Sequence, residues 1–382
     1  MEHSDEYKQL LDIIKHSVLN NSSEDAIQIQ NPERLFQLAK KHDCLHLVGY
    51  AIKKGMLTLI DEDAQKKFIA QYYGAMRRVM ALEHEILSIR EAFEKDSVDF
   101  IFLKGAVLRK YYPEECMRVS GDMDVLVRIV DLTSAEKVLS ERLCYQVKEK
   151  GAHHNHVMSP AGINLDLHFT LTERINSAKP YLDEVWNRSV LIEGKKHEYR
   201  MTDEMFYLFH IYHASVHFQM GGCGIRAVLD TWVLNHRIEF NRESRKDLLE
   251  KSGLLKFAVA LENIAEKWFS NGEDSGYSDI EEYILTGGLA GGHRHVAAVQ
   301  AQKGSRFKYV FSRIFPPYRT LKFGYPILQK CPVLLPFCWI HRLISGAFTG
   351  KTKKAKYELK QSKEGAQQSK EIAKLYQKLG LE

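Results

Sequence analysis

Two short stretches that alternate apolar and polar residues constrain the fold of this chain more than any other feature. Residues 122–128 are Asp-Met-Asp-Val-Leu-Val-Arg, and residues 163–169 are Ile-Asn-Leu-Asp-Leu-His-Phe. Both patterns predict β-strands, in which successive side chains point to opposite faces. Asp122 and Asp124 therefore share one strand face, roughly 7 Å apart, and Asp166 lies on the polar face of the second strand. If the two strands are neighbours in one sheet, the three carboxylates converge.

Three carboxylates at close range raise one another's pKa unless cations lie between them. Mg²⁺ suits such a group because it takes oxygen ligands and usually leaves positions for water and for substrate phosphates. Two such ions can clamp an attacking oxygen and a leaving pyrophosphate. We therefore predict Asp122, Asp124 and Asp166 as metal ligands and catalytic residues, with Mg²⁺ as the cofactor.

A phosphate-binding turn is predicted next to this group. Residues 98–103 (Val-Asp-Phe-Ile-Phe-Leu) form a β-rich run that stops at Lys104 and Gly105. Glycine lets the backbone approach a phosphate closely, and the amides that open a following helix favour anions. Arg118 can hold a phosphate with its forked guanidinium, and the alternative is an ion pair with the nearby carboxylates.

Helical periodicity surrounds the strand region. Apolar residues recur at three- and four-residue spacing in the first 95 residues, and helices return after Thr202, a predicted N-cap. Residues 133–136 (Thr-Ser-Ala-Glu) are predicted to be a capping box that opens a helix. The expected fold class is α+β, a small mixed-sheet domain flanked by N-terminal and C-terminal helical regions. The expected divisions are a helical region at 1–95, the α/β domain at 96–195, a helical domain at 196–345 and a basic helical tail at 346–382.

Several histidines are expected near the carboxylates. His168 shares the strand face of Asp166 and is predicted to orient a carboxylate through a hydrogen bond. His210, His213 and His217 are spaced so that one helix face carries all three. We expect that face to turn toward the catalytic cleft, on the acceptor side. A zinc site is the alternative, although no further ligand stands at a familiar spacing.

Two further groups of polar residues receive structural interpretations. Arg226 is assigned to the acceptor side of the cleft, and an ion pair with Asp230, one helical turn later, is its default interpretation. Residues 153–156 (His-His-Asn-His) are expected to lie exposed beside a turn.

The net charge of +5 hides an asymmetry along the chain. Residues 303–382 contain 17 Lys and Arg against 4 Asp and Glu, a local charge of +13, which leaves about −8 for the first 302 residues. Such a basic segment indicates a polyanionic neighbour, namely a membrane surface, a lipid-linked phosphate or a nucleic acid, and a solvated helical face is the alternative.

An apolar segment precedes the last basic residues. Residues 331–340 are too short to span a bilayer, and Trp339 suits a membrane interface. Packing of this segment against the helical domain is the favoured alternative, because Pro332 and Pro336 make a poor interfacial helix. The basic residues that follow the segment are Arg342, Lys351, Lys353, Lys354 and Lys356.

The sequence also favours a cytoplasmic location. The acidic N-terminus lacks a signal-peptide pattern, and no run of about 18 apolar residues is present. The six cysteines include no C-x-x-C pair, which argues against a structural zinc site and against a disulfide framework.

The chain resembles a known superfamily at these same residues. Residues 102–108 (Phe-Leu-Lys-Gly-Ala-Val-Leu) and 118–127 (Arg-Val-Ser-Gly-Asp-Met-Asp-Val-Leu-Val) resemble the signature of DNA-polymerase-β-like nucleotidyltransferases, and residues 165–168 look like the strand with the third carboxylate. The superfamily usually has Gly-Ser or Gly-Gly where this chain has Gly105 and Ala106, so a phosphate-binding hydroxyl is missing.

More specifically, the chain resembles a bacterial group of uncharacterised nucleotidyltransferases over roughly residues 30–345. The group is similar in its Leu-Lys-Gly, Arg-x-x-x-Asp-x-Asp and Asp-Leu-His segments, and in a region like Phe315-Pro-Pro. Downstream, the shared positions are His210, His213, Gly224, Arg226 and Asp230.

The resemblance implies transfer of a nucleoside monophosphate from a nucleoside triphosphate to an unidentified hydroxyl or phosphate acceptor, with release of pyrophosphate. Lys104, Gly105 and Arg118 would bind the nucleotide, and Asp166 could also help to deprotonate the acceptor. The alternative is a non-catalytic module that binds a nucleotide or phosphorylated ligand and docks at a membrane or partner protein. Peripheral contact with the anionic inner face of a membrane is a further alternative, and a nucleic acid is also compatible with the sequence as a partner.

Overall fold

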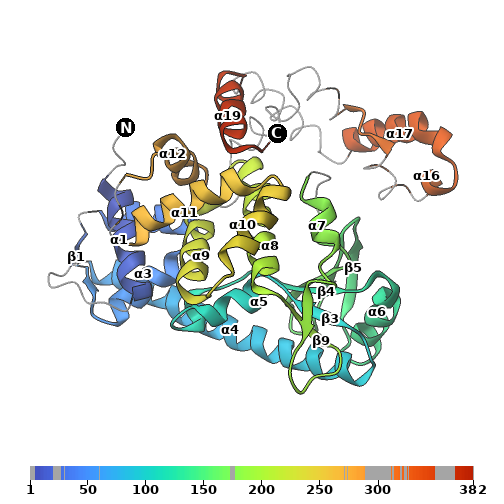
Figure 1. Ribbon diagram of the computed structural model, residues 1–382, viewed down its shortest axis with the longest axis horizontal. Coiled ribbons are helices and arrows are strands. Elements are labelled where there is room, and N and C mark those ends of the chain that lie inside the picture. Colours follow the sequence, from blue (N-terminus) through green and yellow to red (C-terminus); the bar gives the residue numbers. More distant parts are fainter. Residues whose placement is uncertain are drawn as a thin grey trace.

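Figure 1 shows the computed structural model of the chain, in which helices pack around a seven-stranded mixed β-sheet. The structure describes residues 5–19, 27–29, 31–59, 61–172, 177–270, 272, 274–288, 311, 314–318, 321, 325, 327–348 and 366–381. The predicted basic residues at positions 351–356 lie outside this part of the chain.

The α+β prediction is confirmed, and the sheet has seven strands in the order β5-β6-β7-β4-β3-β9-β8. The two central pairs that matter for the site are β3 with β4, which is antiparallel, and β4 with β7, which is parallel. The strands are β3 (Phe100–Phe102), β4 (Met123–Val127), β5 (Gln146–Lys150), β6 (His154–Met158), β7 (Asn164–His168), β8 (Ser189–Leu191) and β9 (Glu198–Met201).

The alternating pattern gives the sheet two different faces. Val125 on β4 and Leu167 on β7 point into an apolar core that α4 and α6 complete, where both residues are fully buried. The residues that directly precede them on the two strands, Asp124 and Asp166, point to the other face of the sheet, toward the C-terminal helices. Burial of one strand face therefore forces the carboxylates onto the opposite face.

Helices before the sheet form one layer. They are α1 (Asp5–Leu19), α2 (Pro32–Lys41), α3 (Leu45–Lys53) and the long α4 (Glu62–Lys95), and β1 (Ile27–Gln28) pairs in parallel with β2 (Leu57–Thr58). Asn31 caps α2 through Arg34, and Asp61 caps α4 through the amides of Asp63 and Ala64. Both caps satisfy amides that have no partner inside a helix.

Helices after the sheet form a second layer. The predicted cap at Thr202 is confirmed, since its hydroxyl accepts a hydrogen bond from the amide of Met205. The main helices are α8 (Asp203–Gln219), α9 (Gly224–Arg237), α10 (Arg242–Lys251), α11 (Leu255–Phe269) and α12 (Ser278–Gly287). Shorter helices lie between strands of the sheet in the sequence, namely α5 (Gly105–Leu108), α6 (Leu132–Glu141) and α7 (Lys179–Asp183), and α6 packs with α4 on the apolar face of the sheet. Toward the C-terminus the structure describes α16 (Ile327–Lys330), α17 (Leu335–Phe348) and α19 (Ala366–Leu379).

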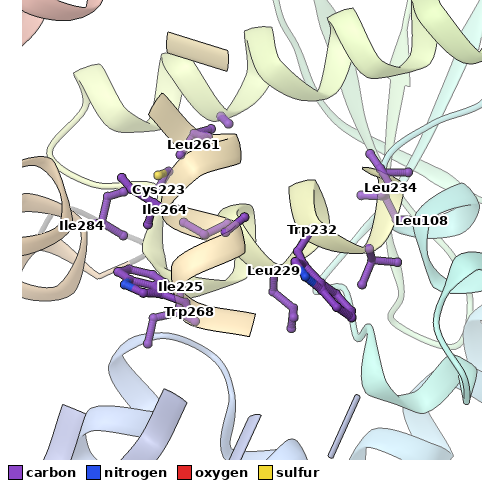
Figure 2. Packing of buried hydrophobic residues seen from close by; sticks show 14 of the residues in the cluster. Leu108, Cys223, Ile225, Leu229, Trp232, Leu234, Leu261, Ile264, Trp268 and Ile284 are labelled. Atoms are coloured by element: carbon purple, nitrogen blue, oxygen red, sulfur yellow. The ribbon is translucent and has the colours of Figure 1, made fainter. Parts of the chain in front are cut away.

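The two helical layers share one hydrophobic core. It extends from Leu10 on α1 to Leu381 after α19 and includes most of α8, α9 and α11. In Figure 2, Trp232 of α9, Ile264 and Trp268 of α11 and Ile284 of α12 are among the side chains of this core. The described helices on either side of the α/β segment are therefore packed together in three dimensions.

The predicted capping box at residues 133–136 is wrong. A 3₁₀ turn, η3 (Ile129–Asp131), leads directly into α6, so Thr133 lies inside the helix. Glu136 instead accepts hydrogen bonds from Lys150 and Asn155 on the adjacent hairpin. This tertiary contact replaces the local bond that the sequence pattern predicted.

The apolar segment at residues 331–340 lies in η4 (Pro332–Leu334) and α17. Cys338 is buried in a small cluster with Leu321 and Leu328, whereas Val333 and Phe337 are 79% and 68% exposed. Each helix in the described ranges falls short of the length or apolar character that a bilayer span requires.

We predict that Gly49→Ala destabilises the protein by about 1–3 kcal/mol, the usual cost of forcing extra atoms into a packed core. A Cβ at Gly49 of α3 would lie 2.9 Å from the carbonyl carbon of Phe68 on α4. Gly74→Ala within α4 is the matched control, because a Cβ there meets open space and alanine is the better helix former. Chemical denaturation of both variants measures the difference, and equal stabilities would contradict a close α3–α4 crossing.

Candidate active site

The three predicted aspartates line one cavity of about 410 Å³, which α8 and α9 also line. Asp124 and Asp166 occupy paired positions on the parallel strands β4 and β7, and Asp122 immediately precedes β4. The strand pairing that the alternating pattern required is present, and all three aspartates reach the same cavity. Other predicted site residues that line this cavity are Lys104, Gly105, Arg118, His210, His213 and Arg226.

Asp124 is the most constrained of the three carboxylates. It is 3% exposed, and its Oδ1 accepts hydrogen bonds from Lys104 Nζ at 2.8 Å and from His168 Nε2 at 2.9 Å. Burial alone would raise the pKa of Asp124, but the Lys104 ammonium and the His168 hydrogen bond outweigh it and hold that pKa well below its usual range. Asp124 is therefore a carboxylate anion at neutral pH.

Asp122 has the opposite electrostatic environment. Its carboxyl faces the cavity, where loss of solvation, and then the negative charges of Asp124 and Asp166, raise its pKa. A bound cation would relieve this repulsion, since it would place positive charge between the carboxylates.

The turn after β3 brings Lys104 to Asp124. Lys104 has φ 44° and ψ −119°, a left-handed conformation that is strained for a residue with a Cβ. Gly105 follows with no space for a side chain, because a Cβ there would lie 2.7 Å from both Cβ and Oγ of Ser120. The amides of Ala106 and Val107 bond to the carbonyls of Leu103 and Lys104, so they are used within the turn itself.

Arg109, which the sequence pattern did not single out, connects the turn to the aspartate loop. Its side chain is 1% exposed, and its guanidinium donates to the Gly105 carbonyl, to the Ser120 hydroxyl and to Glu83 of α4. A buried arginine with three partners from separate segments holds the turn at a fixed distance from the residues before Asp122. Its position one helical turn after Gly105 was the signal available in the sequence.

The prediction that residues 153–156 lie exposed beside a turn is wrong for His154, which is half-buried, and for Asn155, which is 3% exposed. Residues 154–158 form β6, which pairs antiparallel with β7 and sets His154 opposite His168 and His156 opposite Asp166. His156 Nδ1 lies 2.6 Å from Asp166 Oδ1, and His154 Nε2 lies 3.8 Å from Asp166 Oδ2. Cross-strand pairing brings these histidines to the carboxylate site, and the His-x-His alternation was the sequence signal.

Histidines of α8 line the opposite wall. His210 donates to or accepts from the hydroxyl of Thr231 at 2.9 Å, and His213 and His217 bring their Nε2 atoms within 3.2 Å. Burial lowers the pKa of His210 to about 4. Burial, and then the Lys104 ammonium, lower the pKa of His213 well below its ordinary value. Both side chains are therefore neutral at pH 7.

The expected ion pair between Arg226 and Asp230 is wrong. Asp230 Oδ1 instead accepts from Arg118 Nε at 2.7 Å and from the Tyr112 hydroxyl at 2.7 Å. Arg226 turns to Asp43 and to the carbonyl of Val119. Arg118 thus forms an ion pair, which was the alternative to phosphate contact. Its partner is Asp230 on α9 and not one of the carboxylates close to it in sequence. The buried Asp230 carboxylate therefore pairs with the guanidinium of Arg118, whose side chain is 8% exposed, and not with that of Arg226, whose side chain is 22% exposed.

Comparison with known proteins gives one family match. The family described as uncharacterised nucleotidyltransferase matches residues 29–270, a stretch that includes β3, β4, β7, α8 and α9. No curated protein and no solved structure matches the chain.

We predict that acid destabilises this fold partly through His210. The unfolded state binds a proton near pH 6.5 and the folded state only near pH 4, so stability contributed by neutral His210 is present above pH 6.5 and is lost as pH falls toward 4. Between pH 7.5 and 5, His210→Gln should lose less unfolding free energy than wild type, by up to about 2 kcal/mol. Urea denaturation at the two pH values measures this; His84→Gln, on the exposed side of α4, is the control. Identical losses in wild type and His210→Gln would contradict the prediction.

Proposed function

Because the chain belongs to the uncharacterised nucleotidyltransferase family, we propose that it catalyses a Mg²⁺-dependent nucleotidyl transfer. An acceptor hydroxyl or phosphate oxygen attacks the α-phosphorus of a nucleoside triphosphate, a bond forms there, and the bond to the β-phosphate oxygen breaks to release pyrophosphate. The observation that carries this proposal is the placement of Asp122, Asp124 and Asp166 around one cavity.

The donor atoms of this cavity suit the proposed cofactor. Asp122, Asp124 and Asp166 would hold Mg²⁺, since each offers a carboxylate oxygen and Mg²⁺ prefers oxygen ligands. When bound, Mg²⁺ supplies positive charge that stabilises the phosphates and the leaving pyrophosphate. The raised pKa of Asp122 supports this assignment, because the carboxyl is placed where negative charge is crowded.

Other residues of the cavity act on the substrates. Lys104 is the proposed phosphate contact, since its ammonium lies at the cavity beside Asp124. Arg118 places positive charge at the cavity while Asp230 fixes its orientation, and Gly105 lets the turn after β3 pack closely against Ser120. His168 orients Asp124 through its hydrogen bond.

The acceptor is proposed to occupy the side of the cavity lined by α8 and α9. His210, His213 and Arg226 contribute to that wall. Asp166, which lies at the sheet side of the same cavity, is the proposed base that takes the acceptor proton, and His156 contacts its carboxylate.

A second candidate function is non-catalytic binding of a nucleotide or phosphorylated ligand. The Lys104–Asp124 ion pair favours it, because the lysine already supplies a positive charge to the carboxylate that a metal would use. Ala106 also lacks the hydroxyl that is usual in the wider superfamily. The two functions differ in a single observable, the release of pyrophosphate.

We predict that Asp122→Asn weakens Mg²⁺-dependent nucleotide binding by at least about tenfold, the lower limit for residues that support a metal site. The substitution removes one negative charge at almost constant volume, so the fold is retained. Calorimetry with ATP or CTP and Mg²⁺ measures the change, and Asp63→Asn, on the exposed first turn of α4, is the matched control.

The same proteins separate the two candidate functions. Pyrophosphate release from wild type with Mg²⁺ and a mixed metabolite pool, lost in Asp122→Asn, is the expected result for the enzyme. Binding of the nucleotide without pyrophosphate release would support the non-catalytic module. Equal binding by wild type and Asp122→Asn would place the metal site elsewhere.

We further propose that the C-terminal apolar segment contacts an anionic membrane peripherally. Val333, Phe337 and Ile340 are more than half exposed on η4 and α17, and residues 303–382 carry a net charge of +13. Apolar side chains next to excess basic charge combine burial in the interface with attraction to acidic headgroups.

Co-sedimentation with anionic vesicles tests this contact. Binding at low salt should fall at high salt, because basic residues near the surface are screened, and Phe337→Glu should reduce it several-fold by removing an apolar contact and adding repulsion. Val130→Glu, at a residue that is 80% exposed on η3, is the matched control and should bind like wild type. Absence of binding at low salt would contradict the membrane contact and would favour the alternative, in which residues 331–340 serve only to pack against other parts of the protein.

A further inference from the structure

A cluster of imidazoles surrounds Asp166 on the cavity face of the sheet. His154 and His156 extend from β6, and His168 follows Asp166 on β7, so the four side chains occupy a two-by-two block of paired positions. We propose that His154, Asp166 and His168 form a binding site for a divalent transition-metal ion of the Mn²⁺, Co²⁺ or Zn²⁺ class. This site adjoins the three-aspartate group and shares Asp166 with it.

The donor atoms are close enough for one ion. One ligand atom from each of His154, Asp166 and His168 lies within 4.8 Å of the other two. His154 Nε2 is already 3.8 Å from Asp166 Oδ2. Two ligands bound at about 2.1 Å from a common ion lie roughly 3–4 Å apart, so small rotations of these side chains suffice. The strand pairing supplies the backbone positions.

The surroundings hold the cluster together. The rings of His154 and His168 have centroids 4.8 Å apart, and those of His154 and His156 lie 4.6 Å apart. Nδ1 of His154 is buried and has no hydrogen-bond partner within the described part of the chain. A buried polar nitrogen without a partner is costly. The other ring nitrogen, Nε2, faces the carboxylate and lies 3.3 Å from His156 Nε2, so the ring is already held at the cluster.

Hydrogen bonds on either side orient the possible ligands. His168 contacts Asp124 through Nε2 at 2.9 Å, and Asp166 contacts His156 Nδ1 at 2.6 Å. Metal-binding histidines and carboxylates commonly have such partners, which fix the ring orientation and raise ligand basicity. Asp124 and His156 would therefore position the ligands of this second site.

The donor types distinguish this site from the magnesium site. Imidazole nitrogen suits Zn²⁺, Co²⁺ and related ions, whereas Mg²⁺ selects oxygen ligands. An ion held by two imidazoles and one carboxylate should therefore resist displacement by Mg²⁺. Because Asp166 belongs to both groups, occupancy of the histidine site would change the charge available to the carboxylate site, which couples transition-metal binding to the proposed catalysis.

Titration of the purified full chain with Co²⁺, without nucleotide, tests the site. We expect one Co²⁺ bound per chain, with visible absorption typical of imidazole ligation, retained in excess Mg²⁺. His154→Gln should weaken binding by at least about tenfold, while His84→Gln on the exposed side of α4 should bind like wild type. Unchanged Co²⁺ affinity in His154→Gln would overturn the proposal.

A competing pair of imidazoles needs its own control. The Nε2 atoms of His213 and His217 lie 3.2 Å apart on α8, across the cavity, and this pair of imidazoles can also bind Co²⁺. Loss of Co²⁺ binding in His217→Gln but not in His154→Gln would move the ion to α8 and overturn the assignment. Anomalous scattering from Co²⁺ in wild-type crystals locates the ion directly, so the test does not depend on folding of a variant.

The outcome is separable from that of the proposed function. Asp122→Asn removes a carboxylate of the magnesium group and leaves His154, Asp166 and His168 in place. Retained Co²⁺ binding in Asp122→Asn, together with lost Mg²⁺-dependent nucleotide binding, is the expected combination. Absence of Co²⁺ binding in a wild-type protein that still releases pyrophosphate would refute the histidine site alone.

Discussion

A buried ion pair between Arg118 and Asp230 holds the two halves of the cavity together. Arg118 lies in the segment that leads to Asp122, and Asp230 lies on α9 in the other helical layer. Both side chains are less than 10% exposed, and Tyr112 adds a third member through its hydroxyl. Removing one partner of such a pair commonly costs about 3–5 kcal/mol, because the other charge is left buried and unpaired. The position of the aspartate loop against α9 thus depends on this contact.

Further polar contacts fix the same loop from the N-terminal side. His46 contacts the carbonyl of Met117 at 2.9 Å, and Arg78 donates to the carbonyls of Ser120 and Gly121. These bonds satisfy carbonyls that no sheet or helix uses. The loop before Asp122 is therefore held by α3 and α4 of the N-terminal helical layer and by α9 of the C-terminal layer, so both helical layers fix the residues that lead into the cavity.

The sheet side of the cavity shows how one strand pattern separates packing from chemistry. Val125 and Leu167 are fully buried against α4 and α6, while their neighbours Asp124 and Asp166 reach the opposite face. The alternation of apolar and polar residues made strands β4 and β7 predictable, and it also made the separation of their two faces predictable. The cap of α8 at Thr202 was predictable for a similar reason, since a hydroxyl two or three residues before free amides satisfies them locally.

Local sequence patterns by themselves determined strands β3, β4 and β7, the helix start at Thr202, the polar strand face with Asp124 and Asp166, and the resemblance that the family match supports. These features depend on backbone geometry that repeats every two or 3.6 residues. Partner choice depended on tertiary structure: Asp230 pairs with Arg118 across 112 positions, and His154 reaches the site through antiparallel pairing. A sequence does not give the register between strands or the crossing of helices, because these follow from burial summed over the whole core. For that reason only the tertiary structure decided which charges pair and where the histidines gather.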